Sequence, residues 1–503
     1  MKKFLLLTLF SAFAFVAPAQ INNKIVIGEI DSIQSKLLNE KRKIWVHVPD
    51  SGPAGFYAKQ RYPVVYLLDG DAHFSSVVGM IEQLSSVNGN VICPEMIVVA
   101  IPNTDRTRDL TPTHVESDPP FMDRDFSKNS GGGEKFLSFI EKELMPHIDS
   151  LYPTQPYKML IGHSFGGLLV MQALTRHTGL FNAYVAIDPS MWYDKQRFLA
   201  DTKKALTTKK YEGVSLFLGI ANTMNEGMTL LKLQKDTTAA TRHIRSIFDL
   251  DKHVKASKQN GLRYQSNYYG DDSHGSVPLI TEYDALHFIF NYYNLKLTQK
   301  DYTDTTTALA DKYERHFANV SKQLGYKVSP VESLINGHGY GALANKNFKK
   351  AERFFKLNVA NYPGSYNVYD SYGDFFLAKK DTANAIANFT KALSLKENPE
   401  TRGKLDELQG QKALKLTADE LQKYAGEFEI AGVGMTLKTF VSNGVLKISA
   451  PGRPEGELYS TKLPEFRIKN ATGYSFRFEM DSDKPTVLHI VVPEGTFKAM
   501  AKK

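Results

Sequence analysis

The pentapeptide Gly162–Gly166 contains the residues whose spacing most clearly predicts chemistry. It lies between a short apolar segment that favours a strand and an apolar segment that favours a helix. A serine between two glycines at such a junction sits on a sharp turn, with its hydroxyl exposed to a cleft. Ser164 is therefore the candidate nucleophile, and the Phe165 N–H is a candidate donor to an oxyanion at a helix N-terminus. The alternative is a glycine-rich turn with an exposed serine.

A serine needs a general base to become nucleophilic at neutral pH, and the base needs an acid to orient it. Of 13 histidines, His274 lies in a glycine-bounded loop directly after the last predicted strand, ahead of a predicted helix. We predict that His274 is the base. His163, inside the pentapeptide, is expected to point its side chain elsewhere.

The acid is less well determined by the sequence. It is expected to follow the strand predicted over residues 214–220, and Glu226 is the only carboxylate in that loop. Glu226 is therefore the predicted third member. Asp236 and Asp188 remain alternatives, as does a site without a tightly held acid.

Predicted strands and helices alternate from residue 62 onward, which indicates a doubly wound, mostly parallel sheet. The segment 134–144 favours an amphipathic helix that stops at Pro146. Arg106 lies in a polar loop after a buried strand, where it could clamp an anionic group of a substrate or pair with Asp105 or Asp109. Trp192 follows another predicted strand and is a second candidate for substrate binding.

Three motifs together resemble the esterase D-type branch of the α/β hydrolases, which includes enterochelin esterases: Tyr62–Gly70, Gly162–Gly167 and Asp272–Gly275. The resemblance covers about residues 24–295. Within the branch it is strongest to periplasmic enterochelin-esterase-like hydrolases.

This resemblance implies that Ser164 is the nucleophile and His274 the base. It also implies that the backbone N–H groups of Phe165 and Asp71 stabilise the oxyanion, Asp71 lying in the loop after an early strand. The loop carrying Glu226 departs from the family's Gly-x-x-Asp pattern, which leaves the acid open. The implied activity is hydrolysis of carboxylic esters, with siderophore lactones or carbohydrate-linked acyl and feruloyl esters as substrates. Neither a metal nor another cofactor is implied.

The N-terminus has the pattern of a signal peptide over residues 1–19, with Lys2 and Lys3 before an apolar stretch and Ala17–Ala19 as a cleavage site. We therefore expect an exported protein, periplasmic or secreted, with no transmembrane segment. Cys93 is the only cysteine, so an intramolecular disulfide is excluded. The net charge of +8 is spread along the chain without a basic block, which argues against nucleic-acid binding.

The C-terminal half changes character twice. Gly339, Ala351 and Phe355 recur 34 residues later as Gly373, Ala385 and Phe389, the period of tetratricopeptide repeats. Such repeats could bind a protein or peptide partner or act as a spacer. From Thr417, which begins a predicted capping box with Glu420, short alternating segments predict a small antiparallel barrel or sandwich.

These observations predict four segments: a signal peptide (1–19), an α/β-hydrolase esterase domain (20–298), a helical linker with two tetratricopeptide-like repeats (299–412) and a small β-rich domain (413–503). The predicted function is that of an exported serine esterase acting on a small-molecule or glycan-linked ester. Two alternatives are an acyltransferase on the same scaffold and a non-catalytic envelope protein that binds through the repeats.

Overall fold

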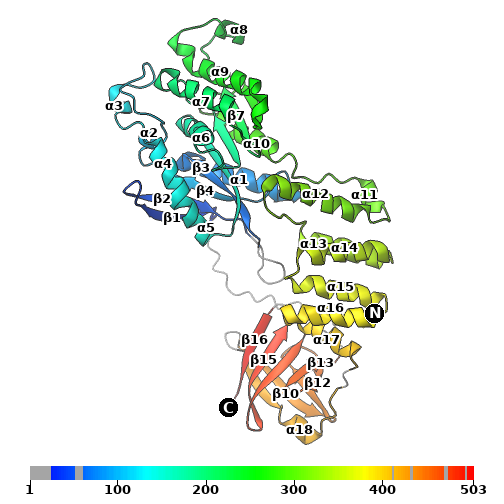
Figure 1. The fold of residues 1–503 in the computed structure, drawn as a ribbon. Helices are drawn as coiled ribbons and strands as arrows, with labels where there is room; N and C mark the ends of the chain where they lie inside the picture. Colours follow the sequence, from blue (N-terminus) through cyan, green and yellow to red (C-terminus); the bar gives the residue numbers. More distant parts are fainter. Residues whose placement is uncertain are drawn as a thin grey trace.

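The computed structural model describes residues 24–50, 60–410, 413–430, 434–469, 474–492 and 495–502. The predicted signal peptide lies outside these residues. A search of the described helices finds none that is long and apolar enough to span a bilayer. Along the chain, a sheet with helices on both faces is followed by a stack of helices and then by a barrel, as the colours from blue to red show in Figure 1.

An eight-stranded sheet organises the first of these parts, with the strand order β1-β2-β4-β3-β5-β6-β7-β8. The pairs β1–β2 and β2–β4 are antiparallel, and every later neighbouring pair is parallel. The bounds are β1 (Glu29–Ser35), β2 (Glu40–His47), β3 (Tyr62–Leu68), β4 (Ile97–Ile101), β5 (Thr154–His163), β6 (Ala183–Ile187), β7 (Ser215–Ala221) and β8 (Arg263–Tyr269).

Side chains alternate between the two faces of the sheet, and each face is covered by helices. Tyr66 and Leu68 belong to one core cluster, whereas Val65 and Leu67 belong to the other. The first cluster includes residues of α4 (Gly133–Phe139), α5 (Met145–Leu151), α6 (Phe165–Arg176), α7 (Arg197–Thr208) and α9 (Arg242–Ala256). The second includes residues of α1 (Gly70–Ser85), α10 (Val277–Ile289) and α12 (Ala308–Leu324). The predicted doubly wound sheet is thus confirmed.

The predicted helix end at Pro146 is wrong. Helix α4 continues through a π-helical turn, Ile140–Leu144, into α5, whose first turn contains Pro146. A π turn is a wider turn, with hydrogen bonds from residue i to i+5. A proline in the first turn of a helical segment is tolerated because it lacks the N–H that an interior position would need. The sequence therefore marks a change of helix geometry here rather than an end.

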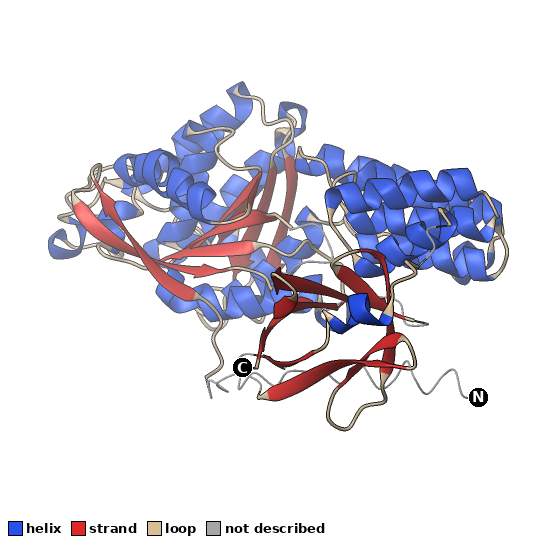
Figure 2. Ribbon diagram, turned by 90° about the horizontal axis from the view of Figure 1, so that it is seen from below, coloured by secondary structure: helices blue, strands red, loops and turns tan. Residues whose placement is uncertain are grey.

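An all-helical stack follows the sheet, and Figure 2 shows it as a group of helices beside the strand-containing parts. Its hairpins pair α13 with α14 and α15 with α16. A Cβ at residue 339 would lie 2.7 Å from the Phe355 ring, and a Cβ at 373 would lie 2.5 Å from the Phe389 ring. Glycine lets each helix pair approach closely at these two positions. The bounds are α11 (Gln299–Thr303), α12, α13 (Glu332–Ala344), α14 (Phe348–Asn361), α15 (Tyr366–Ala378), α16 (Thr382–Leu395) and α17 (Pro399–Leu408).

Two glycines of α13 give a matched test of this packing. We expect Gly339→Ala to destabilise the protein by about 1–3 kcal/mol, because the new methyl group overlaps the Phe355 ring. Gly341 has nothing within 4 Å of its Cβ position, so Gly341→Ala should stabilise the helix by up to about 1 kcal/mol. Midpoints of urea unfolding followed by circular dichroism would check both. Urea midpoints that shift in the same direction in both variants would contradict the close contact between Gly339 and the Phe355 ring.

The C-terminal strands form a closed antiparallel barrel with the order β10-β11-β12-β13-β14-β15-β16-β9. Thr417 and Glu420 form the predicted capping box at the start of the short helix α18 (Ala418–Gln422). Arg467 of the barrel forms a buried ion pair with Asp406 of α17. The strands are β9 (Gly426–Ile430), β10 (Met435–Ser442), β11 (Val445–Ser449), β12 (Gly456–Lys462), β13 (Glu465–Ile468), β14 (Ser475–Asp481), β15 (Lys484–Val492) and β16 (Gly495–Ala501).

Candidate active site

Three loops at one edge of the sheet bring the candidate residues together. Ser164 follows β5, Asp188 follows β6, and His274 lies beyond the end of β8. The strands from β5 to β8 are parallel neighbours, so their carboxyl ends lie at the same edge. Open α/β sheets bind their ligands at this edge.

Ser164 occupies the sharp turn that the sequence predicts. Its backbone is at φ 59° and ψ −113°, a conformation that few non-glycine residues adopt. A Cβ at residue 162 would lie 2.4 Å from the carbonyl carbon of Gly166, so this turn requires glycine there. The Ser164 Oγ lies 3.3 Å from the Oγ of Ser190, and the Ser190 N–H donates to the Ser164 carbonyl at 3.1 Å.

His274 is held by a buried carboxylate. Its Nδ1 lies 2.6 Å from Asp188 Oδ2, while Asp188 Oδ1 accepts a hydrogen bond from the Ala221 N–H at 3.0 Å. The Asp188 side chain is fully buried, whereas 42% of the His274 side chain is exposed. Burial alone would raise the pKa of Asp188, but hydrogen bonds from His243 and His274 outweigh it and hold this pKa far below its usual range. An ionised acid thus lies behind an imidazole that a ligand can reach.

The carboxylate that lies against His274 is not the one expected from the sequence. Glu226 is exposed in the loop after β7, and Asp236 accepts hydrogen bonds from the hydroxyls of Thr238 and Thr241. Asp188, named above only as an alternative, is the carboxylate that contacts His274. The physical reason is that the loop after β7 runs outward toward the short helix α8 (Leu230–Leu233), which Figure 1 shows at the outer end of this part.

The expectation that the His163 side chain would point elsewhere is also wrong. The His163 ring lies against the His274 ring, with 4.5 Å between their centroids. Burial, followed by the nearby His274, lowers the pKa of His163 to about 4. His163 is therefore neutral near pH 7 and forms an uncharged wall beside His274.

Two helix N-termini meet near Ser164, since β3 and β5 are parallel neighbours and lead directly into α1 and α6. A Cβ at residue 166 in α6 would lie 3.1 Å from a carboxylate oxygen of Asp69, the N-cap residue of α1. Phe165 is the first residue of α6, and Asp71 lies in the first turn of α1 rather than in a loop. The first N–H groups of a helix have no intrahelical acceptor, so both remain available to an anion.

Arg106 is paired, but with neither of the partners considered for it. Its guanidinium donates to Asp69 Oδ1 at 2.6 Å and to Oδ2 at 3.0 Å, and it also donates to the His163 carbonyl at 3.2 Å. Burial would raise the pKa of Asp69, but the hydrogen bonds and charge of Arg106 outweigh it and hold this pKa below its usual range. Arg106 thus links the start of α1 to the turn that carries Ser164.

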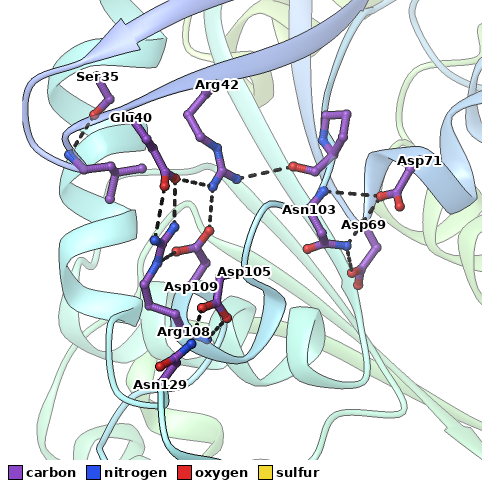
Figure 3. A network of polar contacts seen from close by, with 12 residues as sticks. Ser35, Glu40, Arg42, Asp69, Asp71, Asn103, Asp105, Arg108, Asp109 and Asn129 are labelled. Carbon is purple, nitrogen blue, oxygen red and sulfur yellow. Dashed lines mark hydrogen bonds and ion pairs between the residues drawn. The ribbon is translucent and has the colours of Figure 1, made fainter. Parts of the chain in front are cut away.

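A network of polar side chains supports the loop that carries Arg106 (Figure 3). Asn103 donates to Asp69 at 2.7 Å. The buried Asp109 accepts from Arg42 at 2.6 Å and from Arg108 at 2.7 Å. These contacts connect the loop after β4 to strand β2, and they hold the Asp109 carboxylate on Arg42 and Arg108 rather than on Arg106.

Trp192 lies in a cluster of aromatic rings beside the turn. Its ring stacks on Phe121 with 4.3 Å between the centroids and lies 6.0 Å from the ring of Phe165. Only 6% of Trp192 is exposed, so it offers little surface to a ligand in this conformation. The half-exposed Phe126 also stacks on Phe165, with 6.2 Å between the ring centroids.

Within the described residues, Asp188, His243 and His274 form a group whose ligand atoms lie within 4.8 Å of one another, as a metal site would require. Both histidines contact the same carboxylate oxygen, at 2.6 and 2.8 Å. Ligands of a tetrahedral zinc ion at 2.0–2.1 Å stand about 3.3 Å apart. The observed separations are those of hydrogen bonds, so the group fits a hydrogen-bonded carboxylate better than a zinc ion.

Sequence reasoning missed three residues of the site: Asp69, Ser190 and His243. Asp69 directly follows β3 and Ser190 lies three residues after the end of β6, which is the only signal that the sequence offers for them. His243 lies in the first turn of α9, 55 residues from the carboxylate that it contacts, and nothing in its sequence neighbourhood indicates that contact.

Comparison with known proteins identifies the family. The Esterase family model, described as "Putative esterase", matches residues 35–266, a range that includes Ser164 and Asp188 and ends before His274. Ferri-bacillibactin esterase BesA of Bacillus subtilis is 31% identical over 203 residues, which are 38% of this chain and 68% of that protein. Siderophore enterobactin esterase of Emericella nidulans is 29% identical over 164 residues. These residues are 30% of this chain and 52% of that protein, so the chain spans about half the length of this relative.

Two solved structures share the fold. An IroE-like serine hydrolase from Shewanella oneidensis is 27% identical with a TM-score of 0.54, over 66% of this chain and 98% of that chain. An uncharacterised protein from Capnocytophaga ochracea is 17% identical with a TM-score of 0.50, over 76% of this chain and 99% of that chain, which shows likeness of fold alone. Taken with the α/β sheet and the match to BesA, these comparisons show that the chain belongs to the Esterase family and is a carboxylic ester hydrolase.

Proposed function

We propose that the protein is a serine esterase in which Ser164 is the nucleophile, His274 the general base and Asp188 the acid that orients it. The observation that carries the proposal is the hydrogen bond of 2.6 Å between His274 and the buried Asp188, beside a serine on a strained strand-to-helix turn. A nucleophile, a base and an orienting carboxylate are the three groups that acyl transfer at neutral pH requires.

The chemistry follows from these roles. His274 Nε2 accepts the proton of the Ser164 hydroxyl as the Oγ attacks the ester carbonyl carbon. The N–H groups of Phe165 and Asp71 stabilise the negative charge that develops on the carbonyl oxygen. The C–O bond to the alcohol breaks, and His274 gives its proton to the leaving oxygen. His274 then takes a proton from the water that attacks the acyl-enzyme, and it returns this proton to Ser164 Oγ as the C–Oγ bond breaks and the acid is released.

We further propose that the substrate is a siderophore ester. Relatives of the chain are named as esterases of ferri-bacillibactin, enterobactin and triacetylfusarinine C. The half-exposed Phe126 beside Phe165 offers an aromatic surface next to the nucleophile, which suits a ligand with aromatic groups better than a short acyl ester.

The substrate proposal is tested by comparing hydrolysis of enterobactin and triacetylfusarinine C with that of p-nitrophenyl acetate and butyrate, with Ser164→Ala as the control. We expect kcat/KM for at least one siderophore to exceed that for both small esters, because the small esters cannot use binding contacts outside the reacting centre. A lower value for both siderophores would contradict the substrate class but leave the esterase proposal standing. Acyl products on an added alcohol would indicate an acyltransferase.

Export and the C-terminal segments belong to the same proposal. We infer that residues 1–19 are removed on export to the periplasm or beyond, which the mass of the mature N-terminus would test. We also infer that the helical hairpins are tetratricopeptide-like repeats. The contacts of Gly339 with Phe355 and of Gly373 with Phe389 support this, since they recur at the repeat period.

A further inference from the structure

One oxygen of the Asp188 carboxylate serves two histidines. His274 Nδ1 lies 2.6 Å from Oδ2, and His243 Nε2 lies 2.8 Å from the same atom. The two rings meet edge to face, with 5.3 Å between centroids and an interplanar angle of 86°. The other oxygen is already used by the Ala221 N–H. The proposed mechanism assigns a role to His274 and none to His243.

The hydrogen-bond pattern determines which nitrogen of His243 carries a proton. The ionised Asp188 is an acceptor only, so the Nε2 that faces it must be the donor. His243 is 8% exposed, and its Nδ1 has no hydrogen-bond partner among the described residues. A proton on Nδ1 would bury a charge and leave a donor unsatisfied, which costs more than an unused lone pair. The hydrogen bond therefore favours the tautomer of His243 that carries its proton on Nε2.

A carboxylate that accepts a second hydrogen bond on the same oxygen is fixed in position and has less charge available for each donor. Its first partner, His274, is on a loop, whereas His243 is in the first turn of the 15-residue helix α9. The helical partner can therefore hold Asp188 in the orientation that the base needs.

We propose that His243 is a positioning residue of the esterase, which fixes Asp188 through Nε2 and shares the charge of that carboxylate with His274. This inference rests on the proposed function, because it assumes that His274 is the base and that Asp188 orients it. His243 itself touches neither the substrate nor the reacting atoms in this scheme.

The direction of the effect follows from the sharing of charge. An Asp188 that loses one donor interacts more strongly with protonated His274, and so stabilises the form of the base that cannot accept a proton. The base is active when unprotonated, so the acid limb of kcat/KM must move to higher pH when the contact from His243 is lost.

The other titratable or charged groups near His243 and His274 are held by contacts of their own. Among the described residues, the titratable groups found in contact with the His243 ring are Asp188, after β6, and His274, after β8. His163, against the other side of His274, is held neutral by burial. Arg242, next to His243 in the chain, pairs with Asp118, and Arg245 donates to Thr241 and Thr238.

Two amide variants separate the contact from simple loss of the ring. In His243→Gln the side-chain NH₂ reaches the position of Nε2 and can still donate, whereas in His243→Asn it ends near the position of Nδ1 and cannot. We expect His243→Asn to lower kcat about tenfold with little change in KM, and to raise the midpoint of the acid limb by about half a pH unit or more. His243→Gln should restore the wild-type midpoint and most of kcat.

The control is His253→Asn on the same helix, whose ring contacts the Lys203 carbonyl away from the site. Thermal unfolding of each variant identifies any that fail to fold. If His243→Asn does not fold, the pH dependence of labelling by a fluorophosphonate probe in His243→Gln replaces the comparison of the two variants. A wild-type midpoint in folded His243→Asn, or equal shifts in the Asn and Gln variants, would overturn the inference. Activity that survives in Ser164→Ala would instead overturn the proposed function, whatever the His243 variants do.

Discussion

Ser164→Ala is expected to lower kcat for every ester tested by at least about 10³-fold, because it removes the hydroxyl to which the proposal assigns formation of the acyl-enzyme. The change removes one oxygen atom, the Ser164 Oγ. Among the described residues, the side-chain hydrogen bond of this atom is to Ser190 Oγ at 3.3 Å. The fold and the substrate surface should therefore be unaffected. We expect KM to stay within a few-fold of wild type, since the loss falls on the chemical step.

The measurement is steady-state hydrolysis of p-nitrophenyl butyrate and of a siderophore, with thermal unfolding to verify the fold. Ser190→Ala is the matched control, because it removes the other hydroxyl of that contact and leaves the nucleophile in place. It should retain activity within about tenfold, the loss of a single neutral hydrogen bond. Equal losses of kcat in Ser164→Ala and Ser190→Ala would mean that activity depends on the contact between the two hydroxyls rather than on Ser164 as the nucleophile.

Asp188→Asn is expected to lower kcat by about 10⁴-fold, the size of effect that follows when a triad acid is replaced by its amide. An amide at this position can donate to His274 Nδ1, which stabilises the wrong tautomer and places a proton on the nitrogen that must accept one from Ser164. It also removes the negative charge that stabilises the imidazolium.

Glu226→Gln is the control for Asp188→Asn, since it makes the same chemical change at the acid that the sequence favoured. Glu226 is exposed, so its replacement should change kcat by no more than about twofold. A large loss in Glu226→Gln together with normal activity in Asp188→Asn would reverse the assignment of the acid. Loss in both would indicate that the loop after β7 closes over the site during the reaction.

The parts of the site that the sequence could predict are those encoded locally. Gly162, Ser164 and Gly166 lie within five residues, and the turn that they form leaves no room for a Cβ at residue 162. Two of the central strands, β3 and β4, could likewise be predicted from apolar runs that are buried on both faces. His274 could be selected because it lies just beyond the last strand.

The acid could not be predicted in the same way, because it depends on which loop reaches His274 in space. Asp188 and Glu226 both follow parallel strands that end at the same edge, and their sequences do not show which loop turns inward. Asp188 is at φ 40°, a backbone conformation that the tertiary contacts impose and that no local motif indicates.

Partner choice among charged side chains failed for the same reason. Arg106 has Asp105 and Asp109 beside it in the sequence, but it pairs with Asp69, 37 residues away. Asp105 instead caps α2 (Arg106–Asp109), and Asp109 is taken by Arg42 and Arg108. A short helix turns neighbouring side chains in different directions, so proximity along the chain is a poor guide there.

Covalent trapping tests the central claim most directly, because it identifies the nucleophile without assuming a substrate. The mature protein would be treated with a fluorophosphonate, and the intact mass, the labelled peptide and the remaining esterase activity would be measured together. We expect one adduct per chain, on Ser164, with activity lost in proportion to labelling, and no adduct in Ser164→Ala. Full activity in fully labelled protein, or labelling of a different serine with loss of activity, would contradict the assignment of Ser164 as the nucleophile.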